Sequence, residues 1–138
     1  MTDPLHRPIG WWLKEADARL DAAFARELAA FGVDRRGWQV LASLAAGPST
    51  REQLAAALAP FDAPDVVDGV VDGLATGGWV SESDAGLQLT PEGAERRRQL
   101  AARVGTIRDR VGDALPGDDY VTLVRLLQRL VEAFEPAR

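Results

Sequence analysis

The sequence predicts a mainly α-helical, single-domain protein with one short two-stranded hairpin. The 138 residues suffice for one domain with its own core. Apolar residues recur at three- and four-residue steps along most of the chain. One short stretch instead alternates apolar and polar residues around a turn that closes on glycine. Hydrophobic residues make up 46% and charged residues 27% of the chain, which is a globular composition.

The first two predicted helices fill the N-terminal third of the chain. The first follows an apolar stripe and ends at Gly32, a residue suited to positive φ. The stripe consists of Ile9, Trp12, Leu13, Ala16, Leu20, Phe24, Leu28 and Phe31. Asp34 is expected to cap the second helix, which ends at Gly47-Pro48. The core face of that second helix carries Trp38, Leu41, Leu44 and Ala45.

Two shorter helices are predicted next. The run Ser49-Thr50-Arg51-Glu52 is typical of a capping box, so a third helix should extend through Leu54 and Leu58 to about Ala59. Pro60 breaks that helix. Asp62 is expected to cap a fourth helix with Pro64 in its first turn, ending at Gly77-Gly78. Its buried stripe is Val67, Val70, Val71 and Leu74.

The hairpin and a long helix follow. Residues 79–81 and 87–90 alternate as short strands, and the polar run 82–86 between them suits a turn, so the hairpin forms a small wing. Thr90-Pro91 then provides an N-cap followed by proline at the first helical position. The long helix carries a stripe at Leu100, Val104, Ile107, Val111 and Leu115. Such a stripe requires a partner helix.

The terminal helix, after the break at Pro116-Gly117, has too wide an apolar arc for a single contact. Asp118 or Asp119 is expected to cap it. The arc comprises Val121, Leu123, Val124, Leu126, Leu127, Leu130, Val131 and Phe134. One small monomer cannot bury this arc together with the stripes of the first and long helices, so we expect a homodimer.

Four stretches in this order resemble the MarR family of winged helix-turn-helix regulators. They are Trp38-Gln39-Val40-Leu41-Ala42-Ser43-Leu44, Thr50-Arg51-Glu52-Gln53-Leu54-Ala55, Val70-Val71-Asp72-Gly73-Leu74 with Gly78-Trp79-Val80, and Leu87-Gln88-Leu89-Thr90-Pro91-Glu92-Gly93. The resemblance implies a winged helix-turn-helix over residues 33–90 and a dimerisation region built from helices 1–32 and 91–138. It also implies a transcription regulator, often with a ligand cavity between the two regions.

The charge pattern departs from that family. Between Glu52 and Glu95 there is no Lys or Arg, whereas nine acidic residues occur, and the net charge of the chain is −5. Wings of the family usually carry an arginine that enters the minor groove, but residues 81–86 have no basic side chain. Because duplex affinity rests largely on cations that neutralise phosphates, we expect weak DNA binding.

The candidate DNA-binding residues lie around the helix-turn-helix. The outward face of the fourth helix is expected to carry Asp65, Asp68, Gly69 and Asp72, where an aspartate can accept a hydrogen bond from cytosine. The candidates for phosphate contacts are Arg35, Arg36, Thr50 and Arg51, together with Arg96, Arg97 and Arg98 in the long helix. Any one of these arginines can equally be solvated helix surface. Arg51 is the preferred candidate.

The aromatic residues of the first two helices suggest a ligand pocket between these helices and the long helix. Trp11, Trp12, Phe24 and Trp38 could line a site for a small apolar or aromatic ligand. The alternative is ordinary core packing, because Trp12, Phe24 and Trp38 lie on core-facing stripes. Trp11 falls off the stripe and would line a cavity mouth or a dimer interface.

Several classes of function find no support in the sequence. The chain has no cysteine and one histidine, which argues against a metal site, and no spacing of nucleophile and base suggests an enzyme or a cofactor. No apolar run is long enough to span a membrane and no signal peptide is evident, so a cytoplasmic protein is expected. Fifteen arginines against one lysine, with abundant alanine, suggest a bacterial source.

The sequence therefore predicts a dimeric transcription regulator that binds duplex DNA weakly. The alternative is a paralogue that has lost DNA binding and acts as a small-ligand-binding or protein-docking dimer.

Overall fold

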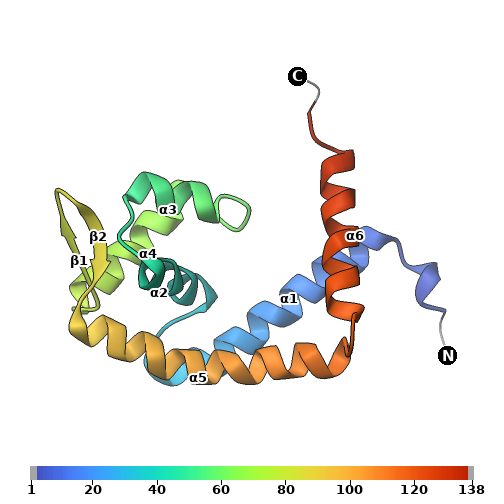
Figure 1. Ribbon diagram of the computed structural model, residues 1–138, viewed down its shortest axis with the longest axis horizontal. Coiled ribbons are helices and arrows are strands. Elements are labelled where there is room, and N and C mark those ends of the chain that lie inside the picture. The colour runs from blue at the N-terminus through green and yellow to red at the C-terminus, as the bar shows by residue number, and fades with distance from the viewer. Residues whose placement is uncertain (1–2, 137–138) are drawn as a thin grey trace. The chain divides into compact units, whose positions relative to one another are not determined.

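The computed structural model describes residues 3–136, which contain six α-helices and one two-stranded antiparallel sheet (Figure 1). This confirms the mainly α prediction with a short two-stranded wing. The helices are α1 (Ile9–Leu28), α2 (Arg35–Ala46), α3 (Arg51–Leu58), α4 (Pro64–Thr76), α5 (Pro91–Ala114) and α6 (Asp119–Ala133). The strands are β1 (Val80–Ser83) and β2 (Gly86–Leu89), and short 3₁₀ helices cover Pro4–His6 and Ala29–Phe31.

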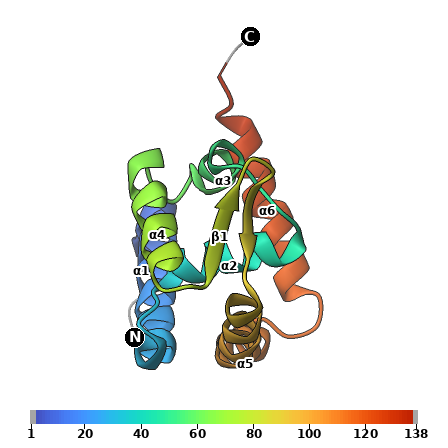
Figure 2. The same ribbon diagram turned by 90° about the vertical axis from the view of Figure 1, so that its left-hand side faces the viewer.

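The chain divides into two compact units, Met1–Val104 and Gly105–Arg138, and the boundary falls inside α5. The first unit holds the main core. Its most deeply buried side chains come from the end of α1, from α2, α3 and α4, from β2 and from the first half of α5. They are Leu28, Val40, Leu41, Leu54, Val67, Val71, Leu87 and Leu100. Within this unit the hairpin lies beside α4, with α2 and α3 packed against the same helix (Figure 2).

Local signals set most of the helix ends. Gly32 adopts φ 68°, the left-handed conformation that ends the first helical segment. The Asp34 carboxylate accepts a hydrogen bond from the Gly37 backbone N–H at 2.9 Å, which caps α2. At the start of α5, Thr90 Oγ1 accepts from Gly93 N–H at 3.0 Å and donates to the Gly78 carbonyl at 2.6 Å. These three predicted ends are confirmed.

Three local predictions were wrong. The capping box at α3 is formed by Thr50 and Gln53, one residue later than predicted, because Ser49 pairs with β2 instead. Asp62 does not cap α4, since its carboxylate pairs with Arg36; Ala63 stands at the N-cap without a side-chain bond. The wing turn is also shorter than the predicted five residues, because Ser83 already pairs with Gly86.

The turn-side half of the wing is fixed to the residue that precedes the N-cap of α3. Ser49 N–H donates to the Leu87 carbonyl at 3.1 Å, and Leu87 N–H donates to the Ser49 carbonyl at 2.8 Å. Gly86 has φ +112°, and a Cβ atom there would lie 2.9 Å from the Ser49 carbonyl oxygen. Only glycine fits this close approach. The bridge therefore holds the wing next to the first turn of α3.

The second unit consists of the rest of α5 and of α6. None of the α6 residues is buried within the described chain. Its exposed apolar side chains are Tyr120, Val121, Leu123, Val124, Leu126 and Val131, with Phe134 directly after the helix. Despite this apolar character, no helix within residues 3–136 has the length and hydropathy required to cross a membrane.

Candidate nucleic-acid interface

We use the term reading head for residues 50–89, which contain α3, α4 and the β1–β2 wing. Arg51 is the only Lys or Arg in this segment. Thr50 immediately precedes it and caps α3, where its hydroxyl oxygen accepts from Gln53 N–H at 3.0 Å. The first turn of α3 thus presents a hydroxyl, a guanidinium and a helix N-terminus together, which is a combination that can contact a phosphate.

The side of α4 turned away from the core is acidic. Val67, Val71 and Leu74 are buried, whereas Asp65, Gly69 and Asp72 are exposed and Asp68 is half-buried. The helix face that a helix-turn-helix protein inserts into the major groove therefore offers carboxylate acceptors and an open glycine position.

The guanidinium of Arg51 contacts three of the head's carboxylates. Its Nε lies 2.9 Å from Glu82 Oε2, and its Nη2 lies 3.1 Å from Glu82 Oε1 and 2.8 Å from Asp72 Oδ1. A longer contact of 3.5 Å joins Nη1 to Asp68. The hydrogen bond from Arg51 lowers the pKa of Glu82, and the bonds to Glu82 and Asp72 raise the pKa of Arg51. We call this group the Arg51 clamp.

Arg35 and Arg36 lie at the start of α2 and make a different set of contacts. Arg35 Nη1 donates to Asp17 at 2.8 Å and to Asp21 at 2.7 Å, so it joins α2 to α1. Arg36 Nε donates to Asp62 at 2.7 Å and a second nitrogen donates to Gln39. Both guanidinium groups also approach the ring of Phe61, at 5.5 and 5.1 Å from its centroid.

Burial distinguishes these two arginines from Arg51. Their side chains are 15% and 13% exposed, against 30% for Arg51. Burial opposes the charged form of Arg35, but the hydrogen bonds to Asp21 and Asp17 outweigh it and raise its pKa. These contacts give Arg35 and Arg36 a structural role, and their predicted DNA contact stays a prediction.

The arginines at the start of α5 differ from one another in exposure. Arg96 donates to Gln99 at 3.4 Å and lies 5.8 Å from the centroid of the Trp79 ring, while Arg98 pairs with Glu95. Arg96 and Arg97 are half-buried and Arg98 is exposed. Their predicted contact with a phosphate stays a prediction.

Sequence reasoning missed the carboxylate partners of Arg51. Glu82 and Asp72 are 31 and 21 residues away from Arg51 along the chain, so no local spacing connects them. A charge argument could have found them, because a lone cation in a segment with many acids and no other base will pair with the nearest carboxylates. No feature of the sequence indicated that the Phe61 ring lies close to both Arg35 and Arg36.

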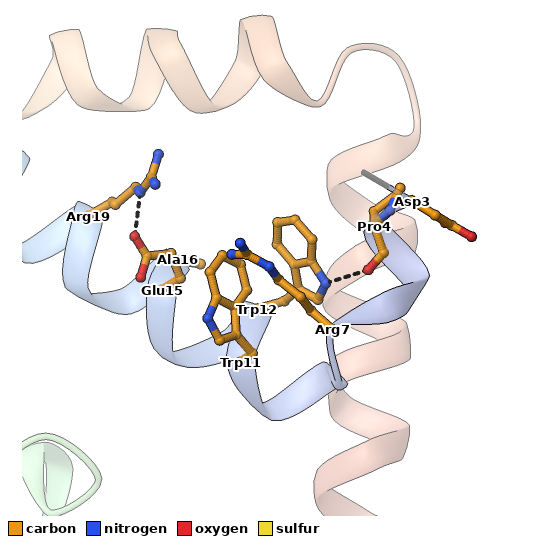
Figure 3. A pocket seen from close by; sticks show the side chains of 8 residues that line it. All are labelled: Asp3, Pro4, Arg7, Trp11, Trp12, Glu15, Ala16 and Arg19. Carbon is orange, nitrogen blue, oxygen red and sulfur yellow. Dashed lines mark hydrogen bonds and ion pairs between the residues drawn. The ribbon is translucent and has the colours of Figure 1, made fainter. Parts of the chain in front are cut away.

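The four residues proposed to line a ligand site separate into two environments. Trp11 and Trp12 line a pocket of about 490 Å³ at the start of α1, with their rings edge to face and their centroids 4.7 Å apart (Figure 3). Arg7 stacks 3.7 Å from the Trp11 ring centroid, and Trp12 Nε1 donates to the Pro4 carbonyl at 3.1 Å. Trp38 instead belongs to the core. Phe24 packs against that core, and the guanidinium of Arg35 lies over its ring.

The core-facing interpretation of Trp12 is wrong for the single chain, because the side chain is 44% exposed. Leu28 at the far end of α1 is the helix's only buried residue, so the first half of the helix reaches beyond the core. A second pocket of about 720 Å³ lies between the end of α1, the start of α2 and the Gly69–Gly73 side of α4. Neither of these two pockets is lined by α5, and the predicted pocket beside the long helix stays a prediction.

Comparison with solved structures identifies proteins that share this fold. No protein-family model matches the sequence, and no curated protein sequence matches it. Solved structures do match. The reduced form of MarR from E. coli has 22% identity and a TM-score of 0.76, covering 94% of this chain and 98% of MarR. CouR from Rhodococcus jostii, bound to p-coumaroyl-CoA, has 22% identity and a TM-score of 0.78, covering 99% and 100%.

A third match is a MarR-family protein of Mycobacterium tuberculosis in complex with DNA, with 22% identity, a TM-score of 0.72, and coverage of 90% of this chain and 98% of that one. These similarities extend over nearly the whole chain and confirm the architecture predicted from the four matching stretches. The chain has the winged-helix fold of the MarR-family transcription regulators.

Proposed function

We propose that this chain is a homodimeric transcription regulator that binds duplex DNA weakly, with α4 in the major groove. The observation that carries the proposal is the exposed face of α4 beside a wing, in a fold that a DNA-bound protein shares over nearly its full length. On this proposal Thr50 and Arg51 contact the phosphate backbone, whereas Asp65, Asp68, Gly69 and Asp72 face the bases. The protein acts in the bacterial cytoplasm, without a cofactor and without enzymatic activity.

The charges of the reading head support weak binding. Arg51 is its one cation, and that cation is already paired with carboxylates. A protein that offers few free cations gains little from counterion release, which supplies most of the nonspecific affinity for DNA. Sequence preference is then left to acceptors on α4, which favour cytosine N4.

Fluorescence anisotropy with a labelled duplex from the region upstream of the protein's own coding sequence tests this proposal. We expect measurable binding at low salt with a shallow salt dependence, because few cations contact phosphates, and a Kd in the micromolar range or weaker at physiological salt. Nanomolar binding to an operator at physiological salt would contradict the weak-binding part. Absence of binding to every duplex at low salt would overturn the DNA-binding function itself.

The exposed apolar residues support the homodimer. Leu5, Ile9, Trp12 and Leu13 form one such group at the start of the chain, and the α6 residues named above form another. Monomeric proteins rarely leave so many large apolar side chains in water, and a second copy would cover them. Leu126 is about half exposed, so Leu126→Arg should leave the single chain folded and give a monomer by sedimentation. A folded wild-type monomer at micromolar concentration would contradict the dimer.

A ligand-binding dimer is the second candidate, favoured by the two pockets. CouR carries p-coumaroyl-CoA in the same fold, and the pocket at Trp11 and Trp12 offers aromatic walls beside the guanidinium of Arg7. A planar aromatic acid suits such a site. A screen of aromatic acids read by tryptophan fluorescence should give a saturable change that Trp11→Ala removes. No response to any of these acids would contradict the ligand-binding candidate.

A further inference from the structure

The Arg51 clamp occupies the guanidinium face on which the proposed function depends. Four hydrogen bonds leave the guanidinium, two to Glu82 and one each to Asp72 and Asp68. Arginine has five N–H donors in a planar fork, so four of the five are in use. Glu82 binds in the two-pronged manner that a phosphate would adopt. A phosphate can take this position only if Glu82 leaves it.

The charge around the clamp opposes a phosphate as long as the clamp is closed. Three carboxylates surround one guanidinium, so the group has a net charge of −2. Approach of DNA to the closed clamp therefore meets repulsion instead of attraction. Contact between Arg51 and DNA is an exchange of one anion for another.

The clamp can nevertheless open without loss of the fold. Its carboxylates are between 49% and 67% exposed, so each can return to water when it releases Arg51. The Ser49–Leu87 bridge holds β2 next to the start of α3 by backbone hydrogen bonds that do not involve the clamp. Opening thus moves side chains, while the backbone of the head stays as it is.

We infer that Glu82 and Asp72 act as an internal substitute for DNA phosphate, so that the reading head inhibits its own binding to DNA. This inference rests on the proposed function. It makes the affinity for DNA depend on the fraction of molecules in which the clamp is open. A clamp that is open in about one molecule in ten would reduce affinity about tenfold.

The salt dependence of binding gives the inference a specific signature. An ordinary arginine that contacts a phosphate adds about one unit to the slope of log K against log salt. In the clamp, the carboxylates that Arg51 releases regain part of their own cation atmosphere when DNA binds, and together this uptake offsets the cation that Arg51 displaces from DNA. Substitutions that remove the charges of Glu82 and Asp72 should therefore increase the slope of log K against log salt by about one unit.

The test compares Glu82→Gln/Asp72→Asn with a matched control, Glu52→Gln/Asp84→Asn. Both double variants remove one Glu and one Asp charge from the exposed surface of the head, but the control residues make no hydrogen bond with Arg51. Binding of a mixed-sequence 24-base-pair duplex is measured over a salt series. Circular dichroism establishes that each variant is folded.

We expect the clamp variant to bind about tenfold more tightly than the control variant, with a salt slope larger by about one unit. In an Arg51→Ala background this gain should vanish, so that the two double variants behave alike. Equal affinities and slopes of clamp and control variants, with measurable binding by the wild type, would overturn the inference and leave the proposed function intact. No binding by the wild type or any variant at 20 mM salt would overturn the proposed function and the inference with it.

Discussion

The pair Arg35–Arg36 and the Arg51 clamp use the same chemistry with different consequences. In both regions a guanidinium meets carboxylates from other elements at 2.7 to 2.9 Å. Arg35 and Arg36 are shielded from water and lie against Phe61, whereas Arg51 and its partners lie at the surface of the head. Breaking an ion pair that is shielded from water costs much free energy, because a charge is left without a partner. An exposed pair can exchange its partner for water or for another ion at little cost. One region is therefore suited to hold the fold and the other to meet a ligand.

The largest effect that follows from this comparison concerns Arg35. Arg35→Ala should lower the free energy of unfolding by about 2 kcal/mol, because it removes charge-assisted hydrogen bonds to Asp17 and Asp21 and the cover of Phe24. Urea denaturation measures the change. The matched control is Arg19→Ala, whose pair with Glu15 is largely exposed and whose loss should cost below about 0.5 kcal/mol. Equal effects of the two substitutions would remove the distinction between shielded and exposed pairs.

A smaller effect is expected for Arg51. Arg51→Ala should lower the free energy of unfolding by less than about 1 kcal/mol, since exposed ion pairs contribute little. Salt sharpens the comparison: in 1 M NaCl the effect of Arg51→Ala should become undetectable, while that of Arg35→Ala should persist. Urea titrations at low and high salt give both numbers. Persistence of the Arg51 effect in 1 M NaCl would show that the clamp is not an exchangeable surface contact.

The smallest effect is a pH dependence carried by Glu82. Its pKa in the folded protein lies below the ordinary value of 4.5, because Arg51 donates to the charged carboxylate, and nearby Asp72 works in the opposite direction. A depressed folded-state pKa contributes stability above pH 4.5 that is lost as the pH falls through the folded-state value. The stability difference between wild type and Glu82→Gln should thus be present at pH 7 and shrink below pH 4.5. A difference that is constant from pH 7 to pH 3 would contradict the contact.

Local sequence signals predicted the fold well because each acts within a few residues. Gly32, Asp34 and Thr90 end or cap their helices through contacts no more than three residues away, so their roles can be read from the sequence. The same kind of reasoning failed at Ser49 and Asp62. There a distant partner, Leu87 or Arg36, competes with the helix end for the same polar group.

The candidate site was less predictable, since its contacts join distant segments. The composition of the head predicted an acidic α4 and singled out Arg51, but only the fold brings Glu82 of β1 to that side chain. The aromatic residues show the same limit. Trp12 and Trp38 have similar helical spacing, yet one lies on a part of α1 that extends past the core and the other within the core.

The turn of the wing is a natural point for insertion. The Ser49–Leu87 bridge and the close approach of Gly86 to Ser49 hold β2 as far as its turn-side end, so new residues can enter only in the turn itself, between Ser83 and Gly86. An insertion of the same number of residues on both sides of the turn keeps the register of the existing pairs, so Leu87 stays opposite Glu82 and in the core. Each residue added to both strands extends the hairpin by about 3.3 Å. A longer, arginine-bearing wing can thus be grafted onto this head without repacking the domain beneath it.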